Sequence, residues 1–196
     1  MKVFINPGHD LDLDPGACAS GLKESEVVAE VGDLVKQYLE AAYVEVVQVL
    51  QDDDLDYVCR AANRSGADIF VSIHCNAATN EQASGTETFA MSEAMFSKRL
   101  AHYIQDQIVS SCGTVDRGIK FANYYMLKNT TMPAVLVELA FISNKSDALL
   151  LLEKKDEFAR AIARGITDYE VSLKPFVSTN TGRENNPYAM RGTGYE

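Results

Sequence analysis

The feature that most constrains this sequence is the alternation of short apolar runs with longer segments of helical periodicity. The apolar runs are rich in β-branched residues and lie at 3–5, 44–49, 69–73, 86–89 and 134–137. Each is short enough to form a single β-strand. The runs at 69–73 and 134–137 hardly alternate between apolar and polar residues, which is typical of strands covered on both faces. We therefore expect a largely parallel central sheet.

Apolar residues that recur every three or four positions predict the helices between these strands. The pattern predicts helices at about 25–43, 55–65, 93–110 and 155–169. Strands that alternate with helices indicate an α/β fold with helices on both faces of the sheet. After Pro175 the sequence becomes polar and loses its apolar period. We predict one catalytic domain at 1–175, followed by a polar C-terminal tail or linker at 176–196.

Composition excludes several classes of protein. The 196 residues carry a formal net charge of -10, which argues against nucleic acid as a partner because phosphate binding needs a basic surface. No apolar run approaches the roughly 20 residues of a transmembrane helix. None of the four cysteines lies in a metal-binding spacing, and we expect free thiols. The N-terminal residues do not resemble a signal peptide, so we expect either a removed leader or phage-type release from the cytoplasm.

Polar side chains stand where three of the predicted strands end. His9 follows the first strand through a turn sequence, His74 follows the run at 69–73, and Glu138 follows the run at 134–137. Ligands of α/β sheets bind beyond the carboxyl ends of the strands, so these side chains should meet at one edge. A buried carboxylate there needs a partner. Two imidazoles are natural zinc ligands, and a catalytic zinc site needs three protein ligands plus an open position.

The candidate for the third ligand is an acidic residue at the start of a predicted helix. Glu24 opens the helix that begins at about Ser25, and helix N-termini in such folds point back toward the ligand site; Glu26 is the nearest alternative. A helix N-terminus also stabilises a carboxylate without any metal, through its free amides and its dipole. From the residues alone, both a zinc site and a metal-free helix start remain open at this position.

Five separated blocks of sequence resemble a known family of enzymes. They are Asn6-Pro7-Gly8-His9, Asp14-Pro15-Gly16-Ala17, Lys23-Glu24, the segment 71–77 around Ser72-Ile73-His74, and the segment 133–144 that begins Pro133-Ala134-Val135-Leu136-Val137-Glu138. In this order they resemble the N-acetylmuramoyl-L-alanine amidases of the Amidase_3 type over roughly residues 1 to 170. The resemblance implies one zinc ion per chain bound by His9, Glu24 and His74, with Glu138 as the catalytic carboxylate. It also implies hydrolysis of the amide bond between N-acetylmuramic acid and L-alanine in peptidoglycan.

Several neighbouring residues are assigned outside the site. His102 lies within a helical period and is interpreted as a surface residue, and Asn76 and Asn144 as turn residues. Alternation along the strand should point Cys75 away from the metal. An ion pair is the favoured role of Arg117, although a guanidinium there could also bind a peptide carboxylate or an oxyanion.

Two other functions remain as alternatives to the amidase. A zinc carboxypeptidase or peptide amidase on a similar sheet would cut within the stem peptide, the short peptide that begins at the L-alanine. A wall-binding module with an inactive site is the non-enzymatic alternative. We expect a monomer that acts on the cell wall, on the extracellular or periplasmic side, as either a phage endolysin or a host autolysin.

Overall fold

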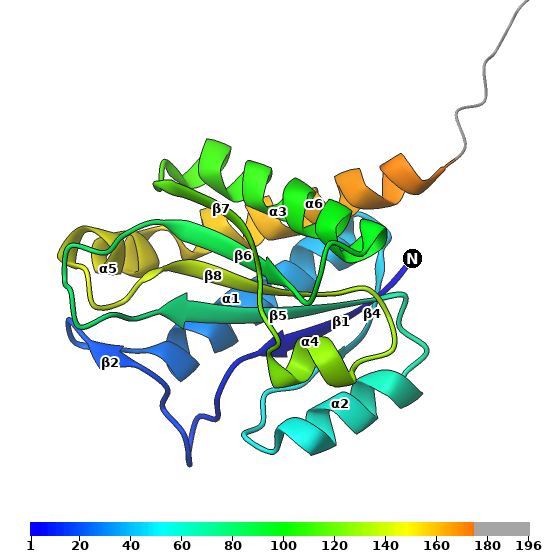
Figure 1. The fold of residues 1–196 in the computed structure, drawn as a ribbon, viewed down its shortest axis with the longest axis horizontal. Helices are drawn as coiled ribbons and strands as arrows, with labels where there is room; N and C mark the ends of the chain where they lie inside the picture. The colour runs from blue at the N-terminus through cyan, green and yellow to red at the C-terminus, as the bar shows by residue number, and fades with distance from the viewer. Residues whose placement is uncertain (175–196) are drawn as a thin grey trace, which may run out of the picture.

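The computed structural model describes residues 1–174. The predicted tail at 176–196 lies outside the described residues, so the domain boundary stays a prediction. Within 1–174 the chain folds around one sheet with helices on both faces (Figure 1). The predicted α/β class is therefore confirmed.

The central sheet has six strands in the order β4-β1-β5-β8-β6-β7. Their bounds are β1 Lys2–Pro7, β4 Glu45–Val49, β5 Ile69–Asn76, β6 Thr86–Ala90, β7 Asp116–Phe121 and β8 Ala134–Phe141. The neighbouring strands β4, β1, β5 and β8 are parallel, whereas β6 pairs with β8 in the antiparallel sense and β7 pairs with β6 in parallel. The sheet is thus largely parallel, as predicted, with two reversed strands at one edge.

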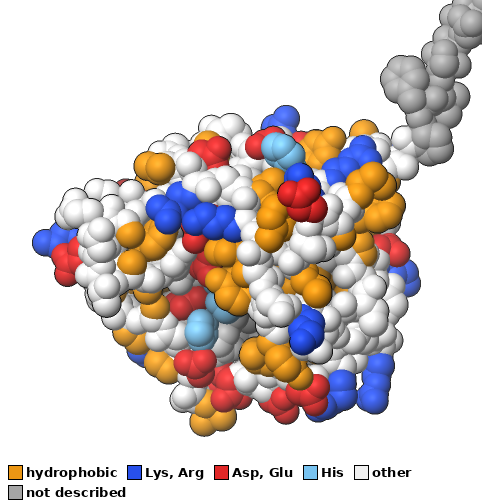
Figure 2. All heavy atoms as spheres, in the orientation of Figure 1, with side chains coloured by type: hydrophobic (Ala, Val, Ile, Leu, Met, Phe, Trp, Pro, Cys, Tyr) orange, Lys and Arg blue, Asp and Glu red, His pale blue; other side chains and the backbone are white. Residues whose placement is uncertain are grey.

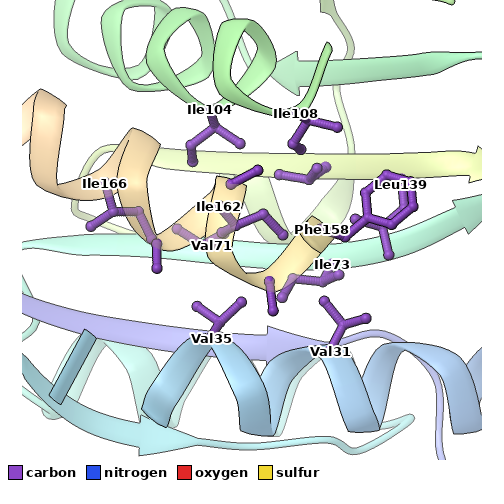
Figure 3. Close-up of a cluster of buried hydrophobic side chains, with 14 of the residues drawn as sticks. Val31, Val35, Val71, Ile73, Ile104, Ile108, Leu139, Phe158, Ile162 and Ile166 are labelled. Carbon is purple, nitrogen blue, oxygen red and sulfur yellow. The ribbon is translucent and has the colours of Figure 1, made fainter. Parts of the chain in front are cut away.

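Three long helices cover one face of this sheet. They are α1 Glu24–Ala41, α3 Met95–Cys112 and α6 Lys155–Leu173. Figure 3 shows how their Val, Ile and Phe side chains meet those of the sheet, among them Val31, Ile73, Ile104 and Ile162, all fully buried. Each such side chain contributes about 1.5–3 kcal/mol on burial. This apolar layer fixes α1, and with it Glu24, against the sheet.

Two shorter helices, α2 Leu55–Arg64 and α4 Tyr125–Asn129, lie over the other face. They cover a second apolar cluster built around Phe4, Phe70 and Leu136. In Figure 1 these helices lie at one end of the strands and leave the opposite end of this face uncovered. His74 in β5 and Glu138 in β8 lie in the C-terminal halves of their strands.

The sequence patterns did not predict every helix and strand of the structure. The edge strand β7, the helices α4 and α5 (Lys145–Glu153), and the small hairpin of β2 Cys18–Ala19 and β3 Leu22–Lys23 were not predicted. All are short or lack an apolar period. Two predicted strands also extend further than their apolar cores, to Asn76 in β5 and to Phe141 in β8. His74 and Glu138 therefore lie within strands, which corrects the prediction that they follow them.

Two expectations from composition hold for the described residues. All four cysteines are unpaired. Between residues 1 and 174, no helix has the length and apolar character that crossing a membrane requires.

Candidate active site

Three predicted ligands, His9, Glu24 and His74, converge in the structure. Each offers one ligand atom, and these atoms all lie within 4.8 Å of one another. Nε2 of His9 is 3.1 Å from Oε2 of Glu24, and Nδ1 of His74 is 3.0 Å from Oε1 of Glu24. The two imidazole rings are nearly perpendicular, with centroids 5.1 Å apart. Two imidazoles and a carboxylate in this arrangement can hold a metal ion.

His9 is held by an unusual local backbone. Its φ is 64°, in the left-handed region that few residues other than glycine adopt. The preceding Gly8 donates its amide to the Ile73 carbonyl at 2.9 Å, and a Cβ on Gly8 would lie 2.1 Å from the His74 ring. Only glycine therefore lets the loop after β1 come this close to β5, which explains the Gly-His pair of the sequence.

Asp14 orients the His9 ring and was not predicted to do so. Its Oδ2 lies 2.7 Å from Nδ1 of His9, while its Oδ1 accepts the Gly16 amide at 3.0 Å. A carboxylate on one ring nitrogen leaves the other nitrogen free to face a metal. The hydrogen bond to Glu24, opposed by burial and reinforced by Asp14, raises the pKa of His9 to about 9.

Glu24 is the first residue of α1, and its side chain is buried. Its carboxylate also accepts the backbone amides of Ala17 and Cys75, at 3.0 and 2.9 Å. Although burial opposes ionisation, hydrogen bonds from His74 and His9 hold the pKa of this carboxyl well below its usual range. The carboxylate is thus kept ionised in the interior, as a metal ligand must be.

Glu138 lies beside this group in the neighbouring strand. It is in register with His74 of β5 on one side and with Glu87 of β6 on the other. Its Oε2 is buried and forms no hydrogen bond to any described residue. Burial, with the charges of Glu24 and Glu87, raises its pKa to about 8. A half-buried carboxyl whose shielded oxygen has no partner, next to the three ligand side chains, fits a site built around a cation and a reacting molecule.

A second group of charged side chains borders Glu138. Oε2 of the buried Glu87 accepts from Nε of Arg117 at 2.6 Å and from Nζ of Lys120 at 2.5 Å, and its Oε1 accepts from Asn76 at 2.7 Å. The expected ion pair of Arg117 is therefore confirmed. Although burial opposes it, the cations hold the pKa of Glu87 below its usual value. Glu87 and Lys120 were not predicted from the sequence. Glu87 could have been found, because a glutamate within the predicted strand at 86–89 needs a partner for its charge.

The side chains that were set aside do not belong to the group of His9, Glu24 and His74. Asn76, predicted to be a turn residue, is instead the last residue of β5, and its side chain donates to Glu87. Glu26 is exposed and pairs with Lys23, and His102 is exposed on α3. Asn144 caps α5 through its side chain. The thiol-bearing residue Cys75 belongs to the core beneath the long helices, as strand alternation predicts.

The chain matches known proteins over nearly all of its described length. A family model described as N-acetylmuramoyl-L-alanine amidase matches residues 3–168. The N-acetylmuramoyl-L-alanine amidase LytC of Bacillus subtilis is 40% identical over 174 residues, which are 85% of this chain and 35% of that protein. An endolysin of Bacillus phage SPP1 is 36% identical over 171 residues, covering 83% of this chain and 62% of the endolysin. This chain therefore spans about a third of LytC and under two thirds of the endolysin.

Solved structures agree with these sequence matches. The crystal structure of an N-acetylmuramoyl-L-alanine amidase from Clostridium difficile 630 superposes with a TM-score of 0.79 at 32% identity, covering 88% of this chain and 98% of that one. An amidase of Nostoc punctiforme, AmiC2, superposes with a TM-score of 0.81 at 30% identity, covering 87% of this chain and 97% of that one.

Proposed function

Because the chain belongs to the N-acetylmuramoyl-L-alanine amidase family, we propose that it hydrolyses the amide bond between N-acetylmuramic acid and L-alanine in peptidoglycan, with zinc as its cofactor. The observation that carries this proposal is the convergence of His9, Glu24 and His74 beside the unpartnered oxygen of Glu138. The donor set of two imidazoles and one carboxylate is the kind that catalytic zinc sites use.

The proposed roles divide between three ligands and one acid. His9, Glu24 and His74 would hold the zinc, which supplies Lewis-acid activation of the scissile carbonyl and of the attacking water. Glu138 accepts the proton of that water at Oε2 and returns it to the departing amine of L-alanine. Asp14 keeps the His9 ring in the tautomer that turns Nε2 toward the ligand position.

Mass spectrometry of digested peptidoglycan tests the proposed bond. The amidase should release stem peptides with a free N-terminal L-alanine and leave the sugar chains intact. Shortened stem peptides would support the alternative carboxypeptidase or peptide amidase and contradict the proposal.

Substitution of Glu138 tests the catalytic assignment. Glu138→Ala should abolish lysis of cell walls, whereas Glu153→Ala, at an exposed glutamate at the end of α5, should keep it. Equal lysis by the wild type and the Glu138 variant would exclude Glu138 from the reaction. Absence of lysis by the wild type would favour a wall-binding module.

The relatives of this chain and the position of its site residues also support proposals on where the protein acts and on its oligomeric state. Its relatives include bacterial amidases and a phage endolysin, so we propose that the chain acts on the outer side of the cytoplasmic membrane, where the wall lies. We propose a monomer with a catalytic domain at 1–175, because all four site residues come from one chain and the family match ends at residue 168. Light scattering of the purified protein would give its mass in solution.

A further inference from the structure

Two basic side chains share one buried carboxylate next to Glu138. Arg117 and Lys120 of β7 both donate to the same oxygen of Glu87, and Asn76 donates to the other oxygen. Within residues 1–174, Arg117 and Lys120 form ion pairs with no other acidic side chain. Two cations on one carboxylate leave a net positive charge beside the site, in a chain whose formal net charge is -10.

These cations are held in place yet remain accessible. The guanidinium of Arg117 lies 4.8 Å from the centre of the Phe141 ring and donates from Nη1 to the Ser84 carbonyl at 3.3 Å. The side chains of Arg117 and Lys120 are 32% and 38% exposed, while that of Glu87 is 6% exposed. The ammonium group of Lys120 has three donors, and Glu87 is its one acceptor among the described side chains. Donors therefore remain for an acceptor from solution.

The position of this pair matches the reach of a peptide. Glu87 of β6 is in register with Glu138 of β8, and β7 is the next strand beyond β6. Neighbouring strands lie about 4.8 Å apart, so β7 is roughly 10 Å from β8. An extended peptide advances about 3.3–3.6 Å per residue, so a peptide whose first amide lies at Glu138 needs about three residues to reach the β7 backbone. The Arg117 and Lys120 side chains extend back to Glu87 in β6, one strand from Glu138, which brings their donors within reach of the second residue. Figure 2 shows basic side chains gathered next to the hollow that holds acidic and histidine side chains.

We propose that Arg117 and Lys120 form a subsite for a free carboxylate on the second residue of the stem peptide, and that the enzyme thereby distinguishes free from amidated stems. This inference rests on the proposed amidase function. An acidic protein repels an anionic substrate in general, and a fixed local positive charge at the correct distance overcomes this for one carboxylate. The buried Glu87 is a positioning residue that aligns the two cations.

The test uses two synthetic substrates and one variant. Both substrates are N-acetylmuramoyl tripeptides, identical except that the α-carboxyl group of the second residue is free in one and amidated in the other. The wild type should cleave the free form with a kcat/KM about tenfold higher, expressed mainly in KM, since one charge-assisted hydrogen bond has about this effect. Lys120→Gln leaves the Arg117–Glu87 pair in place and should lower this ratio below the wild-type value, while the remaining Arg117 keeps it above one.

The control is Lys36→Gln on the exposed surface of α1, which removes the same charge away from the site and should keep the wild-type ratio. A wild type that cleaves both substrates equally well overturns the subsite. A Lys120 variant that slows both substrates alike, with the ratio unchanged, also overturns it and assigns the pair a structural role. Failure of the wild type to cut either substrate before L-alanine would instead refute the amidase function itself.

Discussion

Replacing Glu138 by glutamine should stabilise the metal-free protein at alkaline pH. Oε2 of Glu138 is buried and has no hydrogen-bond partner among the described residues, and burial together with the charges of Glu24 and Glu87 raises the pKa of this carboxyl to about 8. In the unfolded chain the same carboxyl titrates near 4.5, the ordinary pKa of a glutamate. The native state therefore binds more protons than the unfolded state between these values, and the free energy of unfolding falls as the pH rises through this window.

The size of the effect follows from the two pKa values. Each pH unit within the window lowers the free energy of unfolding by about 1.4 kcal/mol. Between pH 5.5 and 8.5 the wild type should lose about 3 kcal/mol relative to Glu138→Gln, because glutamine does not titrate. All other titrating groups are shared by the two proteins and cancel to first order.

Urea unfolding followed by circular dichroism, with a chelator present, measures this difference at both pH values. Glu153→Gln is the matched control, because that glutamate is exposed and its substitution should leave a constant gap to the wild type. A gap between wild type and Glu138→Gln that is the same at both pH values would refute the reasoning. Glu138 would then be ionised in the metal-free protein as easily as in water.

Three further predictions concern the ligands. Asp14→Asn should weaken zinc binding about 10- to 100-fold, because it removes the charge that orients His9. A competition titration with a zinc indicator measures the affinity, and an affinity equal to that of the wild type would contradict this prediction. The affinity for zinc should rise from pH 6 to about pH 9, because the ion must displace a proton from His9, whose pKa is about 9. Zinc affinities measured by calorimetry that do not change with pH would contradict this. Gly8→Ala should destabilise the fold by about 1–3 kcal/mol or more and lose the metal, since the added Cβ would meet the His74 ring; a variant with wild-type melting temperature and zinc content would exclude this.

The sequence was informative wherever a residue pattern reports on burial. Runs such as 69–73 and 134–137 are apolar because the strands are covered on both faces, and this predicted the sheet and the edge to which His74 and Glu138 contribute. Glu24 was placed correctly because the apolar period of α1 marks where the helix begins.

Features that depend on contacts between distant parts of the chain could not be predicted from the sequence. The edge strand β7 carries charged and half-exposed residues, so it lacks an apolar pattern. Its pairing of Arg117 and Lys120 with Glu87 joins residues about thirty positions apart. The role of Asp14 also depends on the left-handed backbone conformation at His9, which no pattern in the neighbouring sequence predicts.

Elemental analysis of the purified protein tests the central claim most directly. The wild type and Glu138→Ala should each contain one zinc ion per chain, and His74→Ala should contain none, because His74 is a ligand and Glu138 is the acid beside the ion. A metal-free wild type, or a Glu138→Ala variant that has lost its metal while His74→Ala retains it, would contradict the assignment.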